Sequence, residues 1–223
     1  MQYPNITKAV FLSRPNRFTA EVEIDGVKET VHVKNTGRCR ELLITGCEVW
    51  LTAPESKGRK TKYDLVAVRK STGVLFNIDS QAPNKVIYEW LADRNFDKVI
   101  PEFTYGDSRI DFYMELDNEK YLLEIKGCTL ENNGVGYFPD APTQRGVKHL
   151  RELAKASADG FKTAVGFVIQ MDGVTEVRPN TATHPEFAQA LEEAVSAGVE
   201  ILFFPCHVTP DTLEITEMIP MRK

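Results

Sequence analysis

The stretch RIDFYMELDNEKYLLEIKGC, residues 109–128, decides the fold of the second half of this chain. Residues 109–116 and 120–128 are rich in apolar and β-branched side chains, which is typical of strands. Between them, Asp117–Glu119 is a strong turn signal. The stretch therefore predicts two adjacent antiparallel strands joined by a tight turn.

Three charged side chains are expected to converge on one face of that hairpin. Folding the chain about Asn118 places Asp111 opposite, or one step diagonal to, Glu124 and Lys126. Glu124 and Lys126 share a face because they are two residues apart on a strand. Two carboxylates hold Mg²⁺ or Mn²⁺ through oxygen, and an ammonium group binds phosphate or orients the attacking water. We therefore predict catalytic roles for all three residues and a metal site at Asp111 and Glu124; ordinary cross-strand charges are the alternative.

A helix with a basic first turn follows the hairpin. Apolar residues at 150, 153 and 154 continue a helical stripe over residues 144–158, and Thr143 is the expected N-cap. Free backbone amides and the positive end of the helix dipole favour phosphate there. The predicted phosphate-binding residues of this segment are Thr143, Arg145, Lys148 and His149. The alternative is an ordinary cap followed by a solvated basic face.

Residues 1–82 are predicted to form short strands separated by turns. The expected strands are Ala9–Leu12, Arg17–Ile24, Lys28–Val33, Glu48–Thr52, Tyr63–Arg69 and Val74–Ile78, with one helical turn at Arg38–Leu43. This pattern suits a small closed barrel of the OB type, which binds nucleic acid on one face. We place the domain boundary between residues 82 and 83, where a proline begins a helix.

Residues 83–223 alternate helices with strands. Besides the hairpin, the expected elements are helices Lys85–Ala92, Gln144–Ala158 and Pro185–Ala197, and strands Lys98–Phe103, Thr163–Met171, Ile201–Cys206 and Thr212–Met218. This order is typical of an α/β sandwich with a mixed sheet. The whole chain is therefore expected to be a two-domain α+β protein.

Charge is divided unevenly between the two halves. Residues 1–82 contain 13 Lys and Arg against 9 Asp and Glu, a net charge of +4, whereas the remainder contains 14 against 23, a net charge of −9. The basic half is suited to phosphate, and the acidic half to a site that recruits a cation first. The predicted nucleic-acid-binding residues of the barrel are Lys57, Arg59, Lys60, Lys62 and Tyr63, with Arg17 and Arg38 in a second cluster. A solvated surface loop is the alternative, and no recognition-helix motif is present, so binding should be weakly sequence-selective.

Some classes of protein are disfavoured by composition. No stretch approaches the ~20 apolar residues that span a bilayer, and the N-terminus lacks a signal-peptide core, so we expect a cytoplasmic protein without a membrane partner. The four cysteines show no CxxC spacing and are expected to be free thiols. The oligomeric state is not predicted by any pattern.

Several motifs carry a resemblance to a known family. They are PNRF (15–18), NTGR (35–38), RKTKY (59–63), PN (83–84), LEIKGCTL (123–130) and FPDAPTQRGVKHL (138–150). With these motifs the chain resembles the sugar fermentation stimulation protein A family along nearly its whole length. The resemblance implies a DNA-binding protein with an N-terminal OB-like domain and a C-terminal domain similar to the PD-(D/E)xK nuclease superfamily. Asp111, Glu124 and Lys126 match that superfamily's acidic, acidic and lysine positions, although Ile110 stands where its name has proline.

Two function classes follow. In the first, the chain is a Mg²⁺- or Mn²⁺-dependent nuclease acting on DNA or RNA, with Glu89 or Glu102 as a further acidic ligand. In the second, it is a non-catalytic DNA-binding regulator of sugar metabolism. The classes differ in whether Glu124→Ala abolishes cleavage while DNA binding is kept. A sugar-metabolic enzyme is a distant third class, because the chain has no cofactor loop and no nucleophile elbow.

Overall fold

The structure is a computed structural model that describes residues 1–35, 37–54 and 58–221. Within these ranges the first domain is a six-stranded sheet in the order β3-β2-β1-β4-β5-β6. Its strands are β1 (Ile6–Ser13), β2 (Thr19–Ile24), β3 (Val27–Val33), β4 (Glu48–Thr52), β5 (Asp64–Arg69) and β6 (Leu75–Asn77). Parallel pairing of β3 with β5 closes the sheet on itself, which confirms the predicted OB-like barrel.

The barrel follows from alternation along its strands. Ala20 and Val22 of β2 and Val31 and Val33 of β3 are buried inside the barrel, while the intervening residues are more exposed. Because successive side chains on a strand point to opposite faces, this period of two puts one apolar face inside.

The second domain is built on a mixed sheet. Its elements are α1 (Ala82–Ala92), β7 (Lys98–Tyr105), β8 (Ser108–Leu116), β9 (Glu119–Cys128), α2 (Gln144–Ala158), β12 (Lys162–Ile169), α3 (Pro185–Ser196), β14 (Glu200–Val208), β15 (Leu213–Ile215) and β16 (Ile219–Pro220). The strand order is β15-β14-β12-β9-β8-β7, with β16 paired to β14. The central strands β9, β12 and β14 are parallel, and β8 is antiparallel to β9. The predicted mixed sheet is confirmed.

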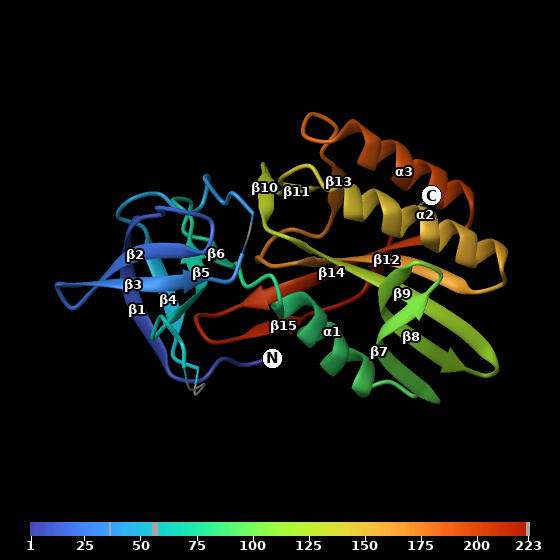
Figure 1. Ribbon diagram of the computed structural model, residues 1–223, viewed down its shortest axis with the longest axis horizontal. Coiled ribbons are helices and arrows are strands. Elements are labelled where there is room, and N and C mark those ends of the chain that lie inside the picture. Colours follow the sequence, from blue (N-terminus) through green and yellow to red (C-terminus); the bar gives the residue numbers. More distant parts are fainter. Residues whose placement is uncertain (36, 55–57, 222–223) are drawn as a thin grey trace.

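Helices cover both faces of this sheet (Figure 1). Val147 and Leu150 of α2 belong to the same buried apolar cluster as Phe167 of β12. On the other face, Val86 of α1 packs in a cluster with Phe112 of β8. None of the described helices is long and apolar enough to cross a membrane.

The turn of the predicted hairpin has the geometry that its sequence requires. Asp117 and Asn118 have φ of 51° and 65°, and Leu116 pairs with Glu119 across them. Two consecutive residues with positive φ form the two-residue turn whose twist matches that of antiparallel strands, and Asp and Asn tolerate this conformation. The turn therefore fixes the register on which the position of the charged residues depends.

A second hairpin was not predicted. Strands β10 (Leu130–Asn132) and β11 (Val135–Phe138) pair through a turn at Asn133 and Gly134, and β11 also pairs with β13 (Val177–Pro179). Both turn residues have positive φ. Asn-Gly is the strongest short-range hairpin signal in a sequence, so this hairpin could have been predicted from Asn133 and Gly134.

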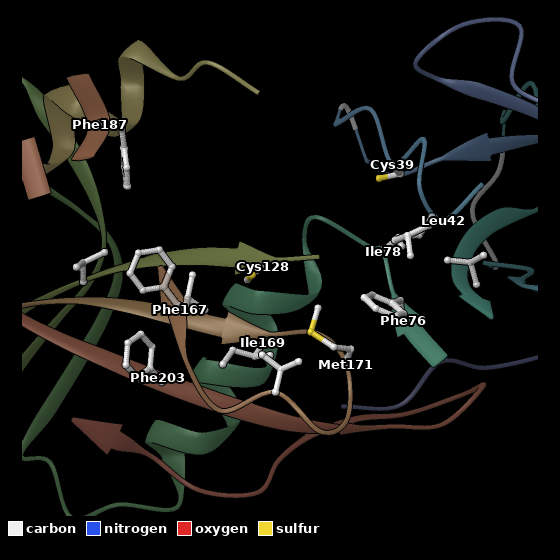
Figure 2. Close-up of a cluster of buried hydrophobic side chains, with 14 of the residues drawn as sticks. Cys39, Leu42, Phe76, Ile78, Cys128, Phe167, Ile169, Met171, Phe187 and Phe203 are labelled. Atoms are coloured by element: carbon white, nitrogen blue, oxygen red, sulfur yellow. The ribbon is translucent and has the colours of Figure 1, made fainter. Parts of the chain in front are cut away.

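The two domains are joined by a buried contact (Figure 2). The Gln170 side-chain amide donates to Asn77 Oδ1 at 2.9 Å and to the Asp79 carbonyl at 3.1 Å, and Asn77 N donates to the Gln170 carbonyl at 2.9 Å. Beside it, Phe76 of the barrel and Met171 of the second domain form a β-bridge and lie in one apolar cluster. The barrel and the sheet domain therefore share one continuous core.

Gln170→Ala should lower the free energy of unfolding by about 2–3 kcal/mol, because it removes both hydrogen bonds that the Gln170 amide donates to buried acceptors of the barrel domain, Asn77 Oδ1 and the Asp79 carbonyl. Urea denaturation measures this loss. The matched control is Gln189→Ala, whose amide is exposed and bonds only to Glu193 on its own helix, so a loss below about 0.5 kcal/mol is expected there. Equal losses in the two variants would contradict a role for Gln170 at the junction.

Candidate functional site

The three charged residues of the hairpin meet at the end of its ladder. Phe112 and Leu123 pair across β8 and β9, and Asp111 and Glu124 are their immediate neighbours on each strand. Lys126 Nζ forms an ion pair with Glu124 Oε1. The structure therefore brings the predicted catalytic trio together.

Asp111 is held from both sides. Its Oδ1 accepts from Asn84 Nδ2 and its Oδ2 from the Ile125 amide, each at 2.7 Å. Burial raises the pKa of this carboxyl, and the nearby Glu124 carboxylate raises it further. Two carboxyl groups that repel each other in a partly dry environment favour binding of a cation.

Glu124 is 2% exposed, and its two oxygens differ. Oε1 receives both Lys126 Nζ and His149 Nδ1, whereas Oε2 has no hydrogen-bond partner among the described residues. Burial by itself would raise the pKa of Glu124, but the charge of Lys126 and then the hydrogen bond from His149 outweigh it and lower the pKa. Glu124 is therefore an anion with one saturated oxygen and one open one.

His149 was predicted from the sequence to bind phosphate at the start of α2. The structure corrects this prediction, because His149 is buried. It is 5% exposed and faces the sheet, since it lies one turn from Gly146 and Leu153 on the buried side of α2. Arg145 Nε donates to His149 Nε2 at 3.3 Å, so Nδ1 carries the proton that is given to Glu124. Its role is to position the carboxylate.

The other predicted residues of the α2 N-terminus are also engaged. Thr143 Oγ1 accepts from Gly146 N at 3.1 Å, which confirms the predicted N-cap. Arg145 donates to His149, and Lys148 Nζ donates to the Asp107 carbonyl at 2.7 Å. Arg145 and Lys148 are both exposed on α2, but neither side chain is without a partner.

Glu89 and Glu102 do not reach the carboxylate pair. Glu89 pairs with the Met1 amine at 2.9 Å, and Glu102 is an exposed partner of Arg109. The residue that α1 brings to the site is Asn84, near the start of the helix, because Glu89 lies more than one turn further along. The predicted third acidic ligand is therefore absent among the described residues, which contain no group of three or more His, Cys, Asp or Glu in metal-binding arrangement.

Two carboxylates nonetheless fit a hard divalent cation. Mg²⁺ is commonly held by one or two carboxylates, with waters and substrate phosphates in its remaining positions. The open Oε2 of Glu124 is a buried acceptor that such an ion would satisfy. Asp111 and Glu124 are therefore the residues able to hold the metal.

Among the predicted nucleic-acid-binding residues of the barrel, one forms an ion pair with a buried carboxylate and others are exposed. Arg59 forms an ion pair with buried Asp64, whereas Lys60 and Lys62 are exposed, with Lys62 4.8 Å from the centre of the Tyr63 ring. In the second cluster Arg17 lies 4.9 Å from the ring centre of exposed Phe18, and Arg38 is exposed. Lys57 lies outside the described residues.

This fold and this site define a class of protein, in which an OB domain is followed by a mixed-sheet domain carrying a buried carboxylate pair. The family model "Sugar fermentation stimulation protein RE domain" matches residues 81–212, and "SfsA N-terminal OB domain" matches residues 12–78. The chain belongs to the sugar fermentation stimulation protein family, as its motifs indicated.

Individual relatives are similar along the whole chain. A sugar fermentation stimulation protein homolog of Desulfitobacterium hafniense (strain Y51) is 51% identical over 225 residues, covering 100% of this chain and 98% of that one. A homolog of Clostridium beijerinckii is 48% identical over 223 residues, covering 98% of each chain. The solved structure of Pyrococcus furiosus SfsA in complex with Ca²⁺ has a TM-score of 0.84 and 29% identity, covering 99% of this chain and 95% of that one.

Asp111→Asn should become more stable relative to the unsubstituted protein as the pH rises from about 3 to 7 in EDTA. A pKa that is raised in the folded state means that ionisation destabilises the fold, and this cost develops as the pH rises above the ordinary aspartate value of ~3.9. Asparagine cannot ionise, and the Asn84 amide can turn to accept from it.

Denaturant unfolding at several pH values measures this difference. Asp107→Asn, in an exposed turn, makes the same change in net charge and should show no such trend. A difference in stability between Asp111→Asn and the unsubstituted protein that stays constant with pH would refute the raised pKa of Asp111, which burial and then the Glu124 carboxylate produce.

Proposed function

We propose that this chain is a metal-dependent nuclease whose barrel holds the nucleic acid and whose carboxylate pair supports phosphodiester hydrolysis. The observation that carries the proposal is the difference between the two oxygens of Glu124: Oε1 is fixed by Lys126 and His149, whereas Oε2 is buried without a hydrogen-bond partner among the described residues. A strand that served packing alone would have no need to bury an anion with an unsatisfied oxygen.

Each residue has a distinct task in this mechanism. Asp111 and Glu124 hold Mg²⁺ or Mn²⁺, which when bound acidifies a water and offsets phosphate charge. Lys126 carries the positive charge nearest the carboxylates and either contacts the phosphate or orients the attacking water. His149, oriented by Arg145, keeps the Glu124 carboxylate from rotating. That the solved relative from Pyrococcus furiosus is in complex with Ca²⁺ supports the binding of a divalent cation by this chain.

The barrel supplies affinity without strong sequence preference. Lys60 and Lys62 are exposed on one loop, and Arg17, Phe18 and Arg38 offer cationic and aromatic surface elsewhere on the barrel domain. Such side chains contact phosphates and stack on bases, which suits DNA or RNA of many sequences. A non-catalytic DNA-binding regulator would share this surface but would not need the open carboxylate.

Glu124→Gln should abolish metal-dependent cleavage of labelled single- and double-stranded DNA and RNA, because it removes the anion but keeps the side-chain shape. Cleavage is compared with Mg²⁺, Mn²⁺ or EDTA, and filter binding should show nucleic-acid affinity largely kept. Glu102→Gln, an exposed residue outside the site, is the matched control and should cut normally. Equal cutting by the two variants, or no cutting by the unsubstituted protein, would contradict the nuclease proposal and favour a non-catalytic nucleic-acid-binding protein.

Lys60→Glu combined with Lys62→Glu should weaken nucleic-acid binding at low salt. Loss of two phosphate contacts should reduce the slope of log K against log salt by roughly 1.4–1.8, the lower figure applying to single strands. The control reverses two exposed lysines of the second domain, Lys155 and Lys162. If both double variants bind alike, the barrel loop has no part in binding.

A further inference from the structure

A small cavity lies at the junction of the two domains, beside Gly127, the residue that follows Lys126 on β9. Its volume is about 110 Å³, and Asn35 and Ser80 line it from the barrel side. From the second domain it is lined by Gly127 and Thr129, which follow Lys126 on β9 and its exit, and by Tyr137 and Asp140. Since one water needs roughly 10–15 Å³, the cavity has room for a small planar group.

The walls of this cavity are fixed by close contacts. A Cβ at Gly127 would lie 2.5 Å from Gln170 Oε1 and 2.8 Å from Pro83 Cγ, so only glycine fits there. Both donors of the Gln170 amide are used in the domain junction, which holds Oε1 in place as an acceptor. Gly37 lies against Asp140 in the same manner. The shape of the cavity is therefore fixed by close contacts at the interface between the domains.

The chemistry of the lining selects among ligands. Among the described residues no lysine or arginine lines the cavity, and Asp140 brings a negative charge, so a phosphate would be repelled. Tyr137 and Phe138 are aromatic and Leu130 is aliphatic, so they offer apolar surface, while Gln170 Oε1, Thr129 and Asp140 offer acceptors. Apolar walls with acceptors fit an aromatic heterocycle that carries an amino group.

We propose that this cavity receives one unstacked nucleobase of the strand whose phosphate lies at Lys126. This inference rests on the proposed function and narrows its substrate to single-stranded or locally opened nucleic acid, since a paired and stacked base cannot enter. It also gives a preference for bases with an exocyclic amino group, which donates to the acceptors, over thymine, which lacks one.

Equilibrium binding of labelled decamers tests the proposal without requiring cleavage. Fluorescence anisotropy with Ca²⁺ compares oligo(dC), oligo(dT) and a wholly abasic strand on three proteins: unsubstituted, Ser80→Tyr and Gln81→Tyr. Ser80 is exposed at the cavity mouth, so a tyrosine there can fill the cavity from the solvent side. Gln81 is its exposed neighbour outside the lining and controls for added bulk. If Ser80→Tyr fails to fold, Asp140→Leu replaces it by removing an acceptor from the lining.

The expected result is about tenfold tighter binding of oligo(dC) than of oligo(dT), because residues of the barrel can stack on the bases of either strand, but only cytosine carries the amino group that the cavity lining accepts. Ser80→Tyr should lose this difference while keeping its affinity for the abasic strand, and Gln81→Tyr should retain it. Equal affinity of the unsubstituted protein for oligo(dC) and oligo(dT), or a preference between them that survives cavity filling, would overturn the cavity proposal alone. Absence of binding to every strand would overturn the proposed nucleic-acid function with it.

Discussion

The buried carboxylate of Glu124 is the constraint around which the second domain is arranged. An anion that is 2% exposed is tolerable only with close cationic or hydrogen-bonding partners, because the cost of removing a charge from water is several kcal/mol. Lys126 supplies one partner from the same strand, and His149 supplies the other from α2. Hence β9 must pair with β12 in one register and α2 must cross the sheet at one position. Removing either donor would leave the charge buried with half of its compensation.

The carboxylate pair is tied to the segment that leaves the barrel, because Asn84, which bonds to Asp111, follows the end of the barrel by only a few residues. Gln170 follows β12 and bonds to Asn77 and Asp79 on the segment that leaves the barrel, so the end of the sheet that carries Lys126 lies against the barrel. If the barrel holds nucleic acid, as proposed, the bound nucleic-acid strand would therefore reach the carboxylates without a long linker or a hinge between the domains. The shared apolar core around Phe76 and Met171 makes this arrangement part of the fold (Figure 2).

Much of this could be predicted from local sequence. The Asp117–Asn118 turn, the period-two strands and the Thr143 cap are set by neighbours in the chain, and all three are present. The role of His149 could have been found from its helical spacing to Leu153, which marks the buried face of α2. Asn84 and the buried side of Gln170 could not, because their partners are 27 and 93 residues away in sequence. Glu89 was favoured by its charge, but the rotation of α1 relative to the sheet is set by packing and directs Asn84 to the site instead.

The proposed nuclease function depends most directly on a cation shared by Asp111 and Glu124. The decisive measurement is an anomalous difference map from crystals grown with Mn²⁺. A single peak about 2.0–2.3 Å from Glu124 Oε2 and from an Asp111 oxygen is the predicted result, as hard divalent ions bind carboxylates at that range. Manganese bound elsewhere, with the Glu124 oxygen still open, would contradict it.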